Sequence, residues 1–230
     1  MKQNHLLRQR IGELNSHWSP ALHPFCAGEQ SKSLERIWLL MDSGVSLDQR
    51  LPRYGLRVAT SFLADELPIA STITAHINEK LGSGNSSYAH QNLYSFLLEA
   101  LDPWRQGQLA EELAEPKRYV MDELDDIALS GDRYMALGCC IVLTLMSGVL
   151  LEWVKVAAEH QGLPWEEQDK DVYQKQAWAL IDAVPNNDTS ARDEVFLGAQ
   201  RTLNAIWRLL DSLYAALPHS AADNEATAAQ

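Results

Sequence analysis

Basic side chains are scarce in this sequence of 230 residues. Lys and Arg together number 19 against 31 Asp and Glu, so the formal net charge is -12. A protein that binds nucleic acid needs a basic surface to neutralise phosphates. The composition therefore excludes DNA or RNA binding as the main activity, and we expect no nucleic-acid partner.

Cysteine is also sparse, and we expect no secretory leader. The three cysteines are Cys26 and the adjacent pair Cys139 and Cys140. Without Cys-x-x-Cys spacing they cannot form a zinc ribbon, and an odd number favours a reducing compartment. Residues 1–14 alternate charged residues with single apolar ones and lack the apolar core of a signal peptide. We expect a cytoplasmic protein.

Long apolar runs are limited to one segment, Tyr134–Leu151, which has eighteen residues without a charge. This is about the minimum length of a membrane-spanning helix. The segment is bounded directly by Arg133 and Glu152, and no basic cluster follows it. A central helix buried on all sides gives the same pattern, and we favour it over a membrane span.

Helical periodicity is present almost throughout, and no run shows a convincing strand alternation. The sequence predicts an all-α fold, a single-domain bundle of seven or eight helices over residues 1–217. Residues 218–230 are small and polar, so we expect a disordered tail. The acidic stretch 103–130 is typical of a solvated helix face.

The helix boundaries are predicted from apolar spacing and from turn-forming residues. The first helix places Leu6, Leu7, Ile11 and Leu14 on one face. Pro52 ends a short piece, and Pro68 breaks the helical pattern that follows it. The predicted helices cover 2–15, 33–43, 54–81, 86–102, 103–130, 133–160, 165–184 and 192–217, with Thr189 or Ser190 capping the last.

His, Glu and a glycine-rich break fall close together in one place. The sequence predicts a helix carrying His76 and Glu79 that ends at Gly82-Ser83-Gly84, and a second helix that carries His90. His76 and Glu79 are three residues apart and so share a helix face. Two His and one carboxylate are the least that an O2-activating iron generally needs. The alternative is an ordinary helix junction, with His76 pointing to solvent and His90 bonded to a buried carbonyl.

Short motifs spread over most of residues 20–215 resemble a known family. They are H-P-F at His23–Phe25, I-N-E-K-L-G-S-G-N-S-S-Y-A-H at Ile77–His90, A-L-G at Ala136–Gly138 and the helix start at Tyr173. The pattern resembles the heme-oxygenase-like helical superfamily, which includes the TenA thiaminases, the PQQ-synthesis oxidase PqqC and the heme-oxygenase-like diiron oxidases. The resemblance implies a small-molecule oxidase or oxygenase that uses iron and O2.

The sequence departs from that family at the expected ligand positions. Thr144 stands where the resemblance implies a further glutamate, and an early-helix glutamate is not found near Arg53 or Tyr54. The His-x-x-x-Asp-x-x-His positions of the next helix hold Gln176, Leu180 and Ala183. The resemblance therefore implies at most one iron, bound by Glu79, His90 and His76, and argues against a diiron site.

Two other functions follow from the same resemblance. With its metal set lost, the bundle would be a non-catalytic pseudoenzyme, a binding module that forms a homodimer or partners an active homologue. The thiaminase branch has a nucleophilic cysteine in the helix that here carries Cys139 and Cys140. A reactive cysteine needs a nearby cation or helix N-terminus, and the neighbours here are Leu, Gly, Ile and Val, so we interpret both cysteines as small buried hydrophobes.

Overall fold

A computed structural model describes residues 4–19, 22–27, 33–48, 50–83, 98–99, 101, 107–162 and 170–217. These residues form eight long α-helices and one π-helix. In chain order they are α1 (His5–Trp18), α2 (Leu34–Asp48), α3 (Leu51–Phe62), α4 (Leu67–Lys80), α6 (Gly107–Asp125), η5 (Asp126–Ser130), α7 (Arg133–His160), α8 (Lys170–Ala183) and α9 (Thr189–Ala216). The prediction of an all-α bundle is confirmed.

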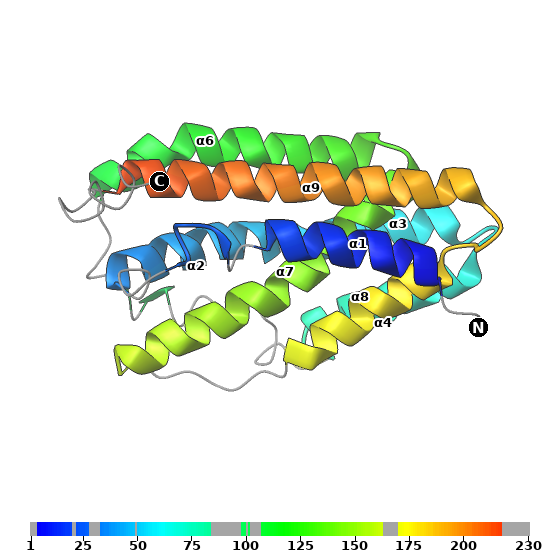
Figure 1. The fold of residues 1–230 in the computed structure, drawn as a ribbon, viewed down its shortest axis with the longest axis horizontal. Coiled ribbons are helices and arrows are strands. Elements are labelled where there is room, and N and C mark those ends of the chain that lie inside the picture. The colour runs from blue at the N-terminus through cyan, green and yellow to red at the C-terminus, as the bar shows by residue number, and fades with distance from the viewer. Residues whose placement is uncertain are drawn as a thin grey trace.

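Helix α7 lies at the centre of the bundle and packs against α9, α8, α3 and α2. In Figure 1, α6 and α9 run side by side along one edge, and α1 lies between α9 and α8. Every side chain of α7 from Ala136 to Met146 is buried, and Gly138 within this range has no side chain. The uncharged run is therefore a central core helix, as predicted. Across the described residues, no helix has the length and apolarity needed to cross a membrane.

Two glycines set the distance between α7 and α9. A Cβ added at Gly138 would lie 2.1 Å from the carbonyl oxygen of Val195, and one at Gly198 would lie 2.0 Å from that of Met135. Real Cβ atoms do not approach a backbone so closely. The two helices therefore cross backbone to backbone, and the A-L-G motif at 136–138 has a packing role.

Several predicted boundaries are wrong for local reasons. Pro52 lies in the first turn of α3, where a missing N–H costs nothing, so it begins a helix and does not end one. The predicted break at Pro68 is confirmed, because α3 ends at Phe62 and Pro68 lies in the first turn of α4. Helix α2 continues through Gly44 to Asp48. The cap of α9 is Asp188, whose carboxylate accepts a hydrogen bond from the Ala191 N–H, and not Thr189 or Ser190.

Helix α1 joins the start of the chain to its late helices. The Arg8 guanidinium donates two hydrogen bonds to the Asp182 carboxylate on α8, and Arg10 contacts Asp193 on α9 at 2.6 Å. Leu7 and Ile11 are fully buried, whereas Leu6, predicted on the same face, is 54% exposed. The polar contacts and the two apolar residues close this side of the bundle.

Candidate functional site

His76 lies inside the bundle, where α4 meets α7. It is only 5% exposed, and its Nε2 is 3.2 Å from the hydroxyl oxygen of Thr144. That hydroxyl donates to the Cys140 carbonyl at 2.8 Å, so it must accept from the ring. Nε2 therefore carries the proton, and in the neutral ring Nδ1 carries the lone pair. The alternative in which His76 points to solvent is wrong.

Glu79, one turn further along α4, has a different partner. It is exposed, and its carboxylate accepts a hydrogen bond from the side-chain amide of Gln176 on α8. The other amide atom, Gln176 Oε1, is buried and has no hydrogen-bond partner in the described part of the chain. His76 and Glu79 thus share a helix but engage two different neighbouring helices.

The turn after α4 forms as predicted up to Ser83. Gly82 and Ser83 both have positive φ, at 83° and 50°, and their N–H groups donate back to Glu79 and Asn78. This left-handed ending stops the helix and satisfies its last carbonyls. His90, the third predicted ligand, lies outside the described residues.

Lys80 is a buried cation that the sequence analysis did not single out. It is 4% exposed, and its Nζ lies 4.5 Å from the centre of the Tyr173 ring on α8. Its spacing in the sequence could have identified it, because Lys80 is four residues after His76 and so lies on the same helix face. An aromatic ring can stabilise an ammonium group that burial has removed from water.

The position of the missing early glutamate holds a tyrosine bonded to a carboxylate. Tyr54 is fully buried on α3, and its hydroxyl donates to Asp125 at 2.6 Å, where α6 passes into the π-helix. Burial, and then the hydrogen bond to Asp125, raise the pKa of Tyr54 above its usual value. Arg50 and Arg53 lie 3.7 and 3.9 Å from the same carboxylate. This acidic residue is therefore not part of a solvated face.

The two adjacent cysteines are buried in α7, as predicted. Burial raises the pKa of Cys139 to about 12, partly offset by a hydrogen bond with Thr202, and raises that of Cys140 well above its ordinary value. A thiol that stays protonated is a poor nucleophile. The two thiols therefore lack the lowered pKa that a cysteine-dependent hydrolase needs.

The described residues do not test the predicted iron site as a whole, because His90 lies outside them, and the site stays a prediction. No three or more His, Cys, Asp or Glu side chains converge among them. His76 is directed to Thr144 and Glu79 to Gln176, on separate helices. The buried ammonium of Lys80 also adds positive charge one turn from His76, which disfavours a divalent cation there.

A cavity of about 480 Å³ lies between α1, α7 and α8. Tyr173 belongs both to its wall and to the contact with Lys80, so the cavity adjoins the polar residues of α4. Apolar area dominates the surface of the cavity. The wall consists of Asn15, Ser19, Leu145, Gly148, Val149, Glu152, Val156, Asp171, Tyr173 and Gln174.

Comparison with known structures identifies the fold. Two crystal structures of a CadD-like protein of unknown function from Nostoc punctiforme match 94% of this chain and 99% of theirs, with TM-scores of 0.65 and 0.66. The chain has the fold of a CadD-like protein. At 14% and 15% identity the likeness shows the fold alone. The match supports the all-helical fold that the resemblance implies. No protein-family model and no curated protein matches the sequence.

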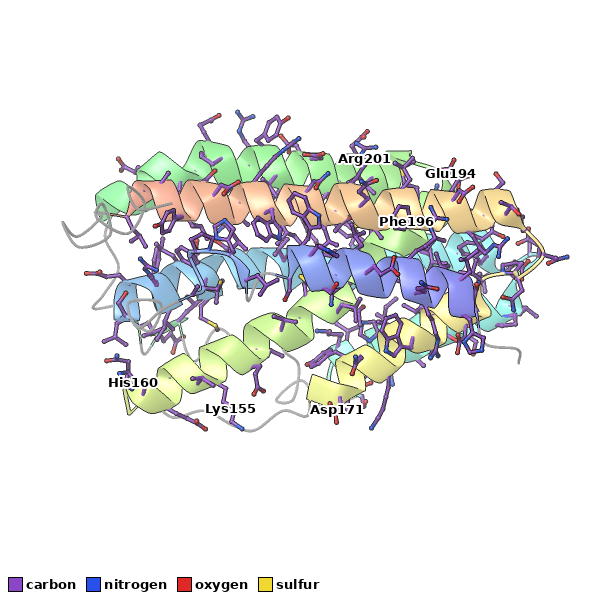
Figure 2. All side chains as sticks on the ribbon, viewed as in Figure 1. Lys155, His160, Asp171, Glu194, Phe196 and Arg201 are labelled. Atoms are coloured by element: carbon purple, nitrogen blue, oxygen red, sulfur yellow. The ribbon has the colours of Figure 1, made fainter. Side chains whose placement is uncertain are left out.

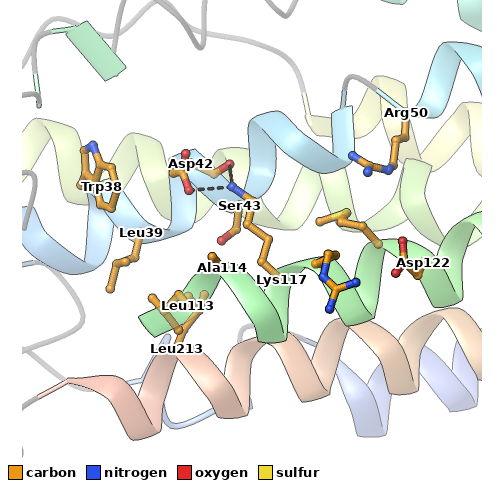
Figure 3. A pocket seen from close by; sticks show the side chains of 12 residues that line it. Trp38, Leu39, Asp42, Ser43, Arg50, Leu113, Ala114, Lys117, Asp122 and Leu213 are labelled. Carbon is orange, nitrogen blue, oxygen red and sulfur yellow. Dashed lines mark hydrogen bonds and ion pairs between the residues drawn. The ribbon is translucent and has the colours of Figure 1, made fainter. Parts of the chain in front are cut away.

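A second hollow in this CadD-like fold lies between α2 and α6 and measures about 390 Å³ (Figure 3). Lys117 bridges it, with Nζ 2.7 Å from the carboxylate and 3.2 Å from the carbonyl oxygen of Asp42. Arg118, also on its wall, is paired with Glu115 at 2.6 Å. Because Lys117 and Arg118 are each paired with a nearby carboxylate, this hollow favours neither a cationic nor an anionic ligand.

Proposed function

We propose that this protein is a small-molecule-binding member of the heme-oxygenase-like fold, in which hydrogen-bonded pairs replace metal ligands. The observation that carries the proposal is the pairing of His76 with Thr144 and of Glu79 with Gln176. Thr144 and Gln176 stand where the resemblance implies a glutamate and a histidine. Thr144 and Gln176 each lie beside one of the predicted ligands, His76 or Glu79. Neither a threonine nor a glutamine side chain is a good metal ligand.

The cavity beside Tyr173 supports a binding function. Its volume of about 480 Å³ is within the range of roughly 300–1,000 Å³ typical of small-molecule sites. A largely apolar wall with a few polar groups is also typical of such sites. The cavity is therefore the place where we expect the ligand.

The alternative is an oxidase or oxygenase with one iron held by His76, Glu79 and His90 and with O2 as co-substrate. The hydrogen bond from His76 Nε2 to Thr144 favours it in one respect, because it leaves the lone pair on Nδ1, the form in which a ring binds metal. The two functions differ in their response to ferrous ion.

Ferrous titration under anaerobic conditions separates them. We expect no saturable binding and no change in melting temperature, for the wild type and for His76→Gln alike. A bound ion would stabilise the fold by about 2.7 kcal/mol at a hundred times its dissociation constant. Stoichiometric ferrous binding that His76→Gln and Glu79→Gln both remove would replace our proposal with the iron alternative.

Binding in the cavity is tested with phenethyl alcohol as a neutral probe. Val149 is half-buried on the cavity wall, and Val149→Phe should fill part of the space and abolish saturable binding measured by calorimetry. The control is Leu197→Phe, at a 41% exposed position on α9 away from the cavity. Equal binding by wild type and Val149→Phe would place the probe elsewhere and refute this site.

The proposal extends to the partners of the protein and to its cellular compartment. We propose a cytoplasmic protein that binds a small molecule either as a homodimer or as the partner of an active homologue. The three cysteines are buried and form no disulfide, which supports a reducing compartment. Sedimentation of the purified protein and analysis of what co-purifies with it test the partner.

A further inference from the structure

We infer that the cavity between α1, α7 and α8 binds an unbranched hydrocarbon chain. The chain lies along α7, with its apolar end buried near Leu145 and its polar head at the opening near Val156. This inference rests on the proposed function and names the class of its ligand. It follows from the length of the α7 face that lines the cavity and from the direction in which the burial of that face decreases.

One face of α7 forms the long wall of the cavity. Its lining residues, which we call the α7 stripe, are Leu145, Gly148, Val149, Glu152 and Val156. They recur every three or four residues, which is the spacing of one helix face. From residue 145 to residue 156 a helix rises about 16 Å. Only an elongated ligand can contact the whole of such a stripe.

Burial decreases from one end of the α7 stripe to the other. Leu145 is 8% exposed, Val149 is half-buried and Val156 is 43% exposed. Apolar surface gains most where water is excluded, and a polar group is best left where water reaches it. The gradient therefore places the apolar end of the ligand at Leu145 and its head at Val156.

Helix α8 shows the same gradient on the opposite wall. Tyr173 is 5% exposed, whereas Asp171, in the first turn of the helix, is exposed. Figure 2 shows Asp171 and Lys155, the residue before Val156, along the same outer edge of the molecule. Both walls thus become exposed toward one edge, where the cavity opens.

The polar side chains on the wall do not select a charge. Glu152 and Asp171 each already take part in an interaction within the chain. The amide and hydroxyl groups of Asn15, Ser19 and Gln174 can both donate and accept hydrogen bonds. Apolar area dominates the cavity surface, so affinity depends mainly on how much hydrocarbon the ligand buries.

A series of straight-chain alcohols tests the inference by calorimetry. We expect the dissociation constant to fall about fourfold for each methylene from 1-hexanol through 1-octanol to 1-decanol, because each added methylene is buried against the α7 stripe. Val149→Phe, in the middle of the stripe, should abolish saturable binding of all three alcohols. A gain of less than about twofold for each methylene would overturn the inference.

Val156→Ser tests the extent and the direction of the chain. An extended chain advances about 1.2 Å per bond, so from Leu145 1-hexanol covers about half of the stripe and 1-decanol reaches contact distance of Val156. Val156→Ser should weaken 1-decanol binding about threefold and leave 1-hexanol binding unchanged. Leu197→Ser on α9, at a similar exposure of 41% and away from the cavity, is the matched control and should change neither.

The outcomes separate the inference from the proposed function. Equal weakening of both alcohols by Val156→Ser, or of neither, would overturn the placement of the chain. Tighter binding of longer alcohols that persists in Val149→Phe would place them on another surface and would also overturn it. Saturable binding of phenethyl alcohol without binding of the straight chains would refute the inference alone. Absence of binding by phenethyl alcohol and by the straight chains would refute both.

Discussion

Burial controls the acidity of the thiols at the scale of single residues. It raises the pKa of Cys26 and of Cys139 from 9.0 to about 12, although Arg36 lowers that of Cys26 in part. Neither thiol therefore ionises in the folded protein near neutral pH. The same burial links folding stability to alkaline pH.

The free energy of unfolding should fall as pH rises from about 9 to about 12. Between these values the unfolded chain loses protons that the folded chain keeps, so ionisation favours the unfolded state. Each such thiol contributes a slope of about 1.4 kcal/mol per pH unit in that window. Urea unfolding at pH 8 to 11 measures the slope.

Cys26→Ala is the control for this alkaline effect, because Tyr and Lys also titrate there. Above about pH 9 the free energy of unfolding of the variant should fall less steeply with pH than that of the wild type, by about the slope that one thiol contributes. Below pH 8 the difference in free energy of unfolding between the two proteins should be constant. A thiol reagent should react only after unfolding. Rapid labelling of the native protein at pH 8 would contradict the burial of these residues.

At the scale of elements, backbone contact between helices depends on two glycines. Gly138→Ala and Gly198→Ala each place a Cβ against a carbonyl oxygen of the facing helix, at 2.1 and 2.0 Å. We expect each to cost about 3 kcal/mol or more, the upper end of overpacking effects, because backbone cannot move aside as a side chain can. Chemical denaturation measures the loss.

Gly12 in α1 is the matched control for the two buried glycines. A Cβ there meets nothing within 4 Å. Gly12→Ala should therefore stabilise the protein by about 0.5–1 kcal/mol, through helix propensity and a less flexible unfolded chain. A similar loss for all three variants would contradict the crossing of α7 and α9 at glycine.

The start of α9 depends on a side chain just before the helix. Asp188→Ala should cost about 1 kcal/mol, because it removes the acceptor for the Ala191 N–H. Thr189→Ala, at one of the two positions that the sequence offered as cap, should cost less than about 0.5 kcal/mol, as exposed substitutions usually do. Thermal unfolding of the two variants side by side decides between the two caps.

At the scale of the whole molecule, the fold is closed by contacts between the first helix and the last two. The Asp182 carboxylate is 15% exposed and binds Arg8, whereas that of Asp193 is 58% exposed and binds Arg10. Asp182→Ala should cost about 2–3 kcal/mol, since it leaves a half-buried guanidinium without its partner. Asp193→Ala should cost less than about 1 kcal/mol.

Equilibrium unfolding of both variants measures this difference, and limited proteolysis shows whether α1 detaches. Equal losses for Asp182→Ala and Asp193→Ala would mean that burial does not distinguish the two ion pairs. Cleavage within residues 5–18 in Asp182→Ala alone would show that the pair holds the first helix against α8.

Helix type and extent were predictable where local signals agree. The predicted helix 133–160 forms α7 with the predicted bounds. Its uncharged run Tyr134–Leu151 is typical of a helix that is buried on all sides at the centre of a bundle. Pro52 was misinterpreted, since proline both ends helices and occupies their first turn. Leu6 was misplaced, because helical spacing defines a face but not how far neighbours cover it.

The candidate site was predictable only in part. The sequence singled out His76 and Glu79, and it singled out Thr144 and Gln176 as residues at positions where the resemblance implies further ligands. Their pairing depends on contacts across 68 and 97 residues of chain, which no local pattern encodes. Lys80 was missed because a lysine near a helix end is usually exposed, and its contact with Tyr173 on α8 is a tertiary one.

The sequence by itself determined an acidic all-helical chain, a central apolar helix and the residue types available for chemistry. Composition and periodicity suffice for these, because they follow from solvation and from the 3.6-residue repeat. Only the tertiary structure decided that His76 faces Thr144, that Glu79 faces Gln176 and that a cavity adjoins Tyr173. Such arrangements arise from how several helices pack at once, and no single segment specifies them.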